Sequence, residues 1–425
     1  MRRGIFTSSA DRLFSVSDSN FVEIKADNTF TQIASLNTGI GTVTMAESVD
    51  VDQNKSQIMI VDGTNGYIYN LGTGVFSVIT SIGYLPGTHV VYYNGYFVQN
   101  VTNTNKFIFS ALYDGTQWDA LDYCVAEGSS DNVTAVATVN NELWIFGGKS
   151  LEFWYVTGNL DDPFARNSSA FINNGCASPY SVQALNNNVF WLGSNAQGNN
   201  IVWMSNSYIP QRISDHGIEY QIGQLADIEN CTCFTYQQEG HFFYVMNFQQ
   251  GNRTLVYDVI TGLWHERGYF NPVSGKNDLG RANCATLWQG KVMVGDWTNN
   301  NIYELDLDTY TDNGNTILRY RQGPHHHYDR KRLFFKEFEL DLERGIGLVT
   351  GQGSRPTVML QSSNDGGYTW TPAVGQVSAG GIGEYQARVR FLRLGQSRDR
   401  VFRVSMTDPV KWILIGARID VEVEK

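Results

Sequence analysis

The stretch KVMVGDWTNNNIYEL (residues 291–305) has a near copy much earlier in the chain, QIMIVDGTNGYIYNL (residues 57–71). Each copy contains an alternating apolar segment, a polar turn and a second alternating segment, which is typical of a β-hairpin. The two turns carry an aspartate at the same place, Asp62 and Asp296, and each is followed by a threonine and an asparagine at matched positions. Such internal repetition indicates a repeat architecture.

The same hairpin pattern occurs at seven places, with first strands beginning near residues 13, 58, 96, 143, 189, 242 and 292. The spacing of about 40 to 50 residues is the period of a four-stranded propeller blade. Most copies follow a further apolar segment and precede a short fourth one. The sequence therefore predicts an all-β chain that begins with a β-propeller of about seven blades. A propeller of six blades is also compatible with the sequence, because only the middle pair of strands in each unit is well repeated.

The C-terminal part differs in pattern and in charge. Five alternating strand patterns follow the segment PHHHYDRKR: LFFKEFELDLE, TVMLQSSNDGGYTW, YQARVRFLRLG, RVFRVSMTDP and WILIGARIDVEVE. Residues 1–310 contain 14 Lys and Arg against 29 Asp and Glu, a net charge of −15, whereas residues 311–425 contain 17 against 13, a net charge of +4. We predict a propeller over residues 1–315 and a small, basic β-sandwich that serves docking over residues 316–425.

Several classes of protein are disfavoured by what the sequence lacks. The five cysteines are scattered and form no C-x-x-C pair, so neither a disulfide framework nor a thiolate zinc site is expected. The N-terminus has no apolar signal region, and no apolar run reaches the roughly 18 residues of a membrane helix. We expect a soluble chain that folds in a cytosol and does not insert into a membrane.

One short motif fits the S-x-D-x-G-x-T-W pattern of an Asp box, a turn known from sialidase propellers. Its residues are Ser363, Asp365, Gly367, Thr369 and Trp370. We predict a structural hairpin turn in which the aspartate caps backbone N–H groups and the tryptophan packs beneath. A sialidase-like enzyme would also need clustered arginines and a nucleophile, and residues 1–310 are poor in arginine.

A histidine triplet, His325, His326 and His327, stands before the first C-terminal strand pattern. Neighbouring residues of an extended chain point to opposite sides, so only His325 and His327 could share a metal ion. Two ligands are a weak basis for a metal site. We therefore predict no metal and assign the triplet a surface or interface role in which its charge depends on pH.

Basic residues supply the candidate docking site: Arg330, Lys331, Arg332, Arg398 and Arg400. Arginine forks suit an acidic neighbour or phosphates. The alternative is a solvated sheet face, because residues 388 and 390, and likewise 398 and 400, alternate in register along a strand. The usual motifs of nucleophilic, metal-dependent and nucleotide-dependent enzymes are absent from the sequence, so we predict neither catalytic residues nor a cofactor.

The whole chain resembles the packaged-DNA stabilisation proteins of short-tailed bacteriophages, also called tail hub or nozzle proteins. The resemblance depends on the order of its motifs. The most characteristic are ELWIFGGKSLEFWYVTG (142–158), LVYDVITGLWHERG (255–268), VMLQSSNDGGYTW (358–370) and IGEYQARVRFLRLGQSRDRVFRVSMTDPV (382–410). Relatives usually carry a further segment before the first blade that ends in a Pro-Gly turn, whereas here Arg2 stands close to the first strand.

This resemblance implies a structural protein of the virion tail, made and assembled in the host cytoplasm. It implies a hexameric nozzle ring that binds the portal adaptor ring, closes the DNA-filled head after packaging, extends the exit channel and carries a tail fibre or spike. Double-stranded DNA would pass without sequence-specific binding, and an acidic propeller agrees with this because it repels phosphates.

Two other functions remain open from the residues alone. The Asp box and the tryptophans Trp144, Trp154, Trp191 and Trp203 would suit a carbohydrate-binding or sialidase-like propeller. A cellular propeller scaffold with peptide partners is the third possibility.

Overall fold

The computed structural model describes residues 1–49, 55–195 and 198–424, which group into two compact units. The first unit comprises Met1–Gly268 and Asp278–Leu305, and the second comprises Tyr269–Asn277 and Asp306–Lys425. The chain therefore passes between the units three times. The sequence pattern placed one boundary near residue 315 and gave no sign that a short hairpin at Tyr269–Asn277 groups with the C-terminal part.

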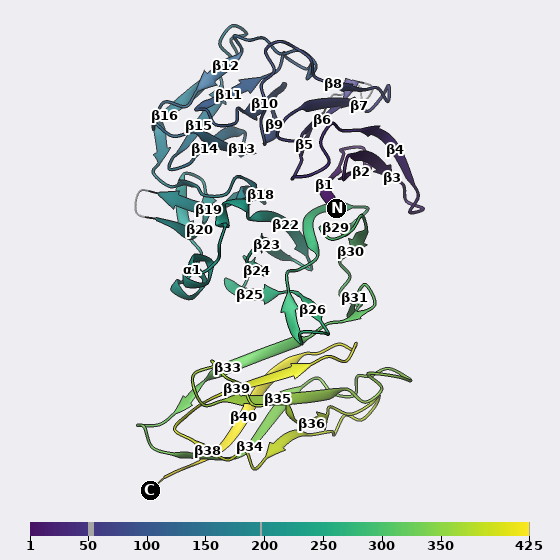
Figure 1. Ribbon diagram of the computed structural model, residues 1–425, viewed down its shortest axis with the longest axis vertical. Helices are drawn as coiled ribbons and strands as arrows, with labels where there is room; N and C mark the ends of the chain where they lie inside the picture. The colour runs from purple at the N-terminus through teal and green to yellow at the C-terminus, as the bar shows by residue number, and fades with distance from the viewer. Residues whose placement is uncertain (50–54, 196–197, 425) are drawn as a thin grey trace. The chain divides into compact units, whose positions relative to one another are not determined.

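The first unit is a β-propeller of seven antiparallel sheets among the described residues (Figure 1). Blades 1 to 3 are formed by β1 Arg2–Thr7, β2 Leu13–Ser17, β3 Asn20–Ile24 and β4 Phe30–Ser35; β5 Thr44–Ser48, β6 Gln57–Val61, β7 Gly66–Asn70 and β8 Phe76–Val78; and β9 Val90–Tyr93, β10 Tyr96–Asn100, β11 Lys106–Phe109 and β12 Tyr123–Val125.

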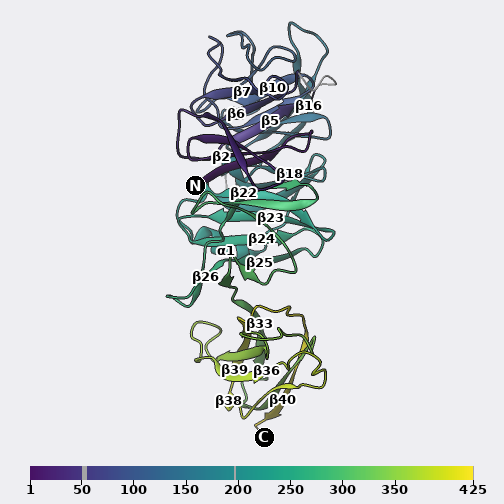
Figure 2. The same ribbon diagram turned by 90° about the vertical axis from the view of Figure 1, so that its right-hand side faces the viewer.

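Blades 4 and 6 follow the same order, blade 5 has five strands, and blade 7 has three strands among the described residues. Figure 2 shows the strands of blade 6 in succession. Their strands are β13 Val133–Val139, β14 Glu142–Gly147, β15 Leu151–Val156 and β16 Phe164–Ile172; β17 Gly175–Cys176, β18 Gln183–Leu185, β19 Asn188–Asn195, β20 Gly198–Asn206 and β21 Ile209–Arg212; β22 Thr232–Gln238, β23 His241–Phe248, β24 Arg253–Asp258 and β25 Leu263–Arg267; and β28 Ala282–Trp288, β29 Lys291–Asp296 and β30 Ile302–Glu304. Short helices, η2 Pro179–Ser181, α1 His216–Gly223 and η3 Ile228–Asn230, lie in blade 5 and before blade 6.

The seven predicted first strands of the hairpins are all present, and each pairs with the following strand. They are β2, β6, β10, β14, β19, β23 and β29. The tip of the β19–β20 hairpin, residues 196–197, lies outside the described residues. Seven sheets also exclude the alternative of six blades, so the prediction of about seven blades is confirmed.

The blades close into a ring through their innermost strands, which contact one another in turn from β1 to β28. The N-terminal strand β1 completes the circle against β28 of blade 7. Asn283 donates from Nδ2 to the carbonyl oxygen of Arg2 at 2.8 Å, and Trp288 donates from Nε1 to the carbonyl oxygen of Asp11 at 3.0 Å. Closure of the ring leaves only short, protected inner edges on the blades.

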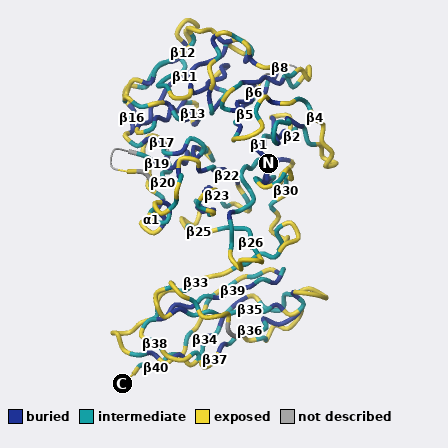
Figure 3. The backbone as a smooth tube through the Cα atoms, viewed as in Figure 1, coloured by how far each residue is buried: buried dark blue, intermediate teal, exposed yellow. Residues whose placement is uncertain are grey.

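Middle strands of the blades are buried on both faces, because each blade packs between two neighbours (Figure 3). In β14 the run LWIF is continuous rather than alternating for this reason. Trp144 on β14 and Trp191 on β19 are both fully buried in one cluster that joins blades 4 and 5. Aromatic residues thus serve as filling between blades.

The second unit is a β-sandwich with one core. One sheet has the order β33–β39–β35–β36, and in the other β34 pairs with β37, β38 and β40. The strands are β33 Arg319–His327, β34 Leu333–Leu342, β35 Thr357–Ser363, β36 Val374–Ser378, β37 Val389–Leu392, β38 Gln396–Ser397, β39 Asp399–Met406 and β40 Leu414–Val423, with the hairpins β26 Tyr269–Asn271 and β27 Lys276–Asp278, and β31 Thr311–Asp312 and β32 Asn315–Thr316.

Residues of the sandwich strands alternate in facing its core. In β34, Leu333 and Phe335 are buried, and after a register shift between Phe335 and Glu337 the alternation resumes with Phe338 and Leu340. All five predicted C-terminal strands are present, so the predicted β-sandwich is confirmed. The segment before them, for which the sequence pattern predicted no strand, contains strand β33. No helix in the described part of the chain is both long and apolar enough to span a membrane.

Candidate docking site

The Asp-box residues form the turn between β35 and β36. The Ser363 hydroxyl donates to Asp365 Oδ1 at 2.6 Å and accepts from the Gly367 amide at 2.8 Å. The Thr369 amide donates to Asp365 Oδ1 at 2.9 Å. The hydroxyls of Ser363 and Thr369 and the Thr369 amide hold the pKa of Asp365 well below its usual range. The carboxylate is therefore engaged in holding the turn.

Trp370 joins this turn to the neighbouring strands. Its Nε1 donates to the carbonyl oxygen of Gly367 at 3.0 Å. The guanidinium carbon of Arg403 lies 3.8 Å from the indole centroid and 5.0 Å from the ring centroid of Tyr320. One cation thus sits near two aromatic rings, an arrangement that stabilises the outer face of this sheet.

The histidine triplet lies on β33 beside β39. His325 Nδ1 is 3.0 Å from Asp399 Oδ2, and the ring of His326 lies 5.9 Å from that of Phe402 on the other side of the strand. Burial lowers the pKa of His326. No group of three or more His, Cys, Asp or Glu residues is arranged to hold a metal ion within the ranges that the structure describes.

Four of the five candidate docking residues lie together at one end of the sandwich. Arg330, Lys331 and Arg332 form the turn from β33 to β34, and the pairing of Leu333 with Ser397, continued by one residue, places Arg332 opposite Arg398. Arg330, Lys331 and Arg398 are exposed. None of the four side chains forms an ion pair among the described residues, and the Glu424 carboxylate accepts from the Arg332 backbone amide at 3.2 Å.

Arg388 and Arg390 form ion pairs, unlike the basic residues of this turn. Arg388 Nε donates to Glu339 Oε1 at 2.7 Å, and Arg390 forms a two-pronged pair with Glu337 on the adjacent strand. These pairs neutralise charge on the outer face of the sheet. For residues 388 and 390 this agrees with the alternative interpretation, a solvated sheet face.

The fifth candidate, Arg400, requires a correction. It is only 4% exposed, and its guanidinium donates to Asn364 Oδ1 at 2.9 Å and to the carbonyl oxygens of Leu394 and Gln396. Its Cζ lies 4.7 Å from the ring centroid of Phe335, and burial lowers its pKa. Arg400 therefore stabilises the interior of the domain through its hydrogen bonds and is not accessible to a partner.

The tryptophans named as possible sugar platforms are not surface residues. Trp144, Trp154 and Trp191 are at most 8% exposed, and Trp203 is partly buried against the cluster that contains Trp144 and Trp191. A sugar ring needs an open aromatic face for stacking. The observation that favoured a carbohydrate-binding propeller is therefore explained by core packing.

The inside of the propeller ring also carries buried polar residues. The ring of His89, just before β9, lies 5.0 Å from that of Tyr180, which reaches across from blade 5. Burial lowers the pKa of His89 to about 4 and raises that of Tyr180. Arg3 of blade 1 is close enough to Tyr180 to counteract part of that rise.

Two histidine and aspartate pairs occur, but neither is arranged for nucleophilic catalysis. His241 Nδ1 is 2.8 Å from Asp258 Oδ2, and the only hydroxyl hydrogen-bonded to that pair in the described part of the chain, on Thr261, donates to the carboxylate. His325 and Asp399 likewise have no serine or cysteine bonded to the imidazole among the described residues. A nucleophile activated by a base is missing from both.

Comparison with known proteins agrees with this geometry. Residues 1–310 match the family described as "Bacteriophage P22 Gp10, beta-propeller", and residues 319–422 match "Bacteriophage P22 Gp10, beta-sandwich". No curated protein matches the chain.

Solved structures similar to this chain are distant. "Structure of U3-55K" is 9% identical, with 70% of this chain and 89% of that chain covered and a TM-score of 0.41. The Cps50 (Swd1) β-propeller domain of Myceliophteria thermophila is 8% identical, with 71% and 95% covered and a TM-score of 0.45. Such distant similarity carries no argument about function.

The family matches cover the propeller and the sandwich in their observed order and take in nearly the whole chain. The chain therefore belongs to the bacteriophage P22 Gp10 family, the structural tail proteins that stabilise packaged phage DNA.

Proposed function

We propose that the chain is the subunit of a hexameric nozzle ring that closes the DNA-filled head after packaging and extends the DNA exit channel. The observation that carries the proposal is the two family matches in sequence order, which together place the chain among phage tail proteins. In this role the ring binds the portal adaptor on one side and a tail fibre or spike on the other, and it acts without catalysis.

The charge division supports this role. A net charge of −15 in residues 1–310 makes the propeller a poor binder of DNA phosphates, which suits a channel that the genome must leave freely. The exposed cations at Arg330, Lys331 and Arg398 supply a surface for an acidic partner. Both features are consistent with a duct that is anchored by its C-terminal unit.

Particles assembled without this chain test the proposal. We expect them to package DNA but to lose it, so that the genome becomes sensitive to added nuclease, and we expect purified chain to restore nuclease resistance. Purified adaptor rings should bind the chain with the stoichiometry of a hexamer. Retention of DNA by particles that lack the chain, or a chain that stays monomeric on adaptor rings, would reject the proposal.

A further inference from the structure

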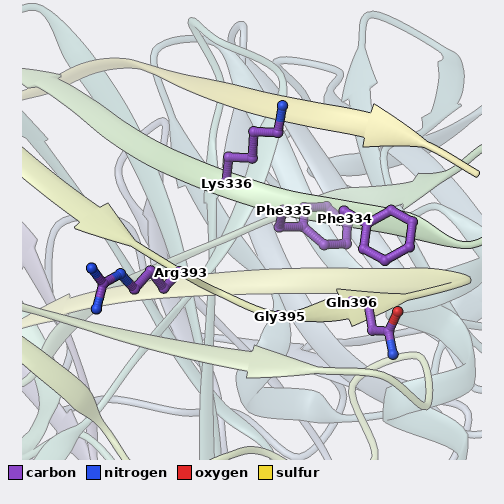
Figure 4. Close-up of a pocket in the computed structure, with 6 residues that line it drawn as sticks. All are labelled: Phe334, Phe335, Lys336, Arg393, Gly395 and Gln396. Carbon is purple, nitrogen blue, oxygen red and sulfur yellow. The ribbon is translucent and has the colours of Figure 1, made fainter.

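The sandwich has an open groove of about 560 Å³ beside the start of β34, lined by Phe334, Phe335, Lys336, Arg393, Gly395 and Gln396 (Figure 4). Phe334 faces outward and is 39% exposed, whereas Phe335 faces the core and is 2% exposed. Phenylalanine at an outward position of an otherwise charged strand face is an apolar surface without a cover.

The shape of the groove comes from a bulge between β37 and β38. Arg393 and Gly395 have φ values of 58° and 77°, in the left-handed region, so the chain bends away between the two strands. The edge stays bonded, because the Arg393 amide donates to the Lys336 carbonyl oxygen and the Phe335 amide donates to the Gly395 carbonyl oxygen, each at 2.9 Å. An added β-strand would find no free edge at these positions, so a ligand must insert a side chain.

Arg400 supports the bulge from within. Its guanidinium donates to the carbonyl oxygens of Leu394 and Gln396, at both sides of Gly395, and lies over the ring of Phe335. A buried cation with two acceptors on one segment keeps that segment in a fixed position. The groove is thus a built feature of the fold.

Three cations without an ion pair among the described residues, Arg332, Arg393 and Arg398, lie at or near this groove, whereas the lining residue Lys336 pairs with Glu422 at 2.9 Å. Arg393 lines the groove. Arg332 and Arg398 lie two residues from Phe334 and Gln396, respectively, and stand opposite each other in the continued register. Several other basic residues of the same unit are paired, for example Arg355 with Glu384 and Lys411 with Glu343. An apolar floor with unpaired cations on its rim is complementary to an acidic ligand that carries an apolar group.

We propose that this groove docks an acidic, extended segment of a partner protein, which inserts one apolar side chain against Phe334 and pairs its carboxylates with Arg332, Arg393 and Arg398. Duplex DNA would satisfy the cations and leave the apolar floor unused, so the observations favour a polypeptide. The inference rests on the proposed docking role of the C-terminal unit and names the chemistry of the partner.

The test uses the full chain and a labelled synthetic peptide with one phenylalanine between two pairs of glutamates, followed by fluorescence anisotropy. We expect binding that weakens about tenfold when the phenylalanine is replaced by alanine or the glutamates by glutamines. Phe334→Ala and Arg398→Glu should each weaken binding of the parent peptide by about tenfold as well. Both side chains are at least partly exposed, so the variants should keep the thermal stability of the parent chain.

Arg321→Glu is the matched control, because this exposed arginine of β33 lies at the other end of that strand from the turn and carries the same charge change. It should leave peptide affinity unchanged. Equal binding of the alanine peptide, or equal loss in Arg321→Glu and Arg398→Glu, would overturn the proposal, since both would show general charge attraction.

Two further outcomes would also overturn it. Competition by short duplex DNA, with no effect of the phenylalanine, would identify a phosphate-binding surface. Dissociation of an oligomer by Phe334→Ala would identify another copy of this chain as the occupant. If Phe334→Ala abolishes peptide binding and particles still need the chain for nuclease resistance, both the docking groove and the nozzle role are supported. Peptide binding without any effect of the chain on particles rejects the nozzle role alone.

Discussion

Asp62 and Asp296 perform the same task in blades 2 and 7. Asp62 Oδ1 accepts from the Thr64 amide at 3.0 Å, and Asp296 Oδ1 accepts from the Thr298 amide at 2.7 Å, so each carboxylate closes the turn of its hairpin. Both are buried, at 7% and 0% exposure. The two sequence stretches are therefore alike because both hairpins use the same type of aspartate-capped turn.

Asp62→Ala should lower the free energy of unfolding of the propeller by about 1–3 kcal/mol, because it leaves buried donors without an acceptor. Asp62 also accepts from the hydroxyls of Thr38 and Tyr67, at 2.6 and 2.9 Å. Urea unfolding followed by tryptophan fluorescence measures the loss. Asp27 caps its own turn through the Thr29 amide at 2.9 Å but is exposed, so Asp27→Ala is the control and should show no measurable change. Equal losses would contradict the assignment.

His89 should make the propeller less stable in acid. Burial lowers its pKa to about 4, below the roughly 6.5 of an unfolded chain, so the unfolded state binds a proton that the folded state refuses. Between pH 7 and pH 5 this costs about 2 kcal/mol of folding free energy, and the cost is absent above pH 7.

His89→Asn should remove that part of the pH dependence, whatever it does to stability at neutral pH. Unfolding free energies at pH 7 and pH 5 give the comparison. An unchanged slope in His89→Asn would show that the imidazole is not the group responsible.

Asp365→Asn should loosen the Asp-box turn and leave the propeller intact. The Thr369 amide donates to this carboxylate, so its protection from hydrogen exchange should fall by about tenfold or more, whereas the amides of blades 1 to 7 should not change. Because the folded pKa of Asp365 is depressed, the parent turn keeps its protection at neutral pH and loses it only in strong acid. Asp399→Asn, in the same sheet but outside the turn, is the control. Loss of protection in both variants would point to the sheet as the cause.

The full chain should not bind duplex DNA at about 150 mM salt with a Kd below roughly 10⁻⁴ M, the weak end of ordinary non-specific binding. A variant with Asp119→Lys, Asp161→Lys and Glu229→Lys, three exposed acidic positions of the propeller, should gain binding that weakens steeply with salt. Tight binding by the parent chain would contradict the view that the propeller avoids its cargo.

The propeller could be predicted from the sequence because hairpin patterns depend on local alternation and turn residues, and seven copies reinforce one another. Strand β33 could not, since Pro324 and a run of exposed polar residues hide an edge strand whose pairing with β39 is non-local. Even the short third strand of blade 7, Ile302–Glu304, was predicted, because it is the second half of the repeated hairpin.

The candidate docking site was predicted in part. The turn residues Arg330 and Lys331 are exposed as expected, because a turn between two strands lies at the surface. Arg400 is buried, which the charge pattern could not predict. Alternation along β39 indicates which residues share a face, but it does not indicate which of the two faces packs against the core. The sequence offered one signal for the groove. Phe334 and Phe335 are adjacent, so one of them had to lie at an outward position of β34, and this is Phe334.

A density map of the assembled particle tests the central claim most directly, because it shows number, placement and path of the DNA together. The account predicts six copies in a closed ring below the portal adaptor, with propellers around the exit channel. Single copies at the side of the tail, or an open stack that does not surround the channel, would contradict it.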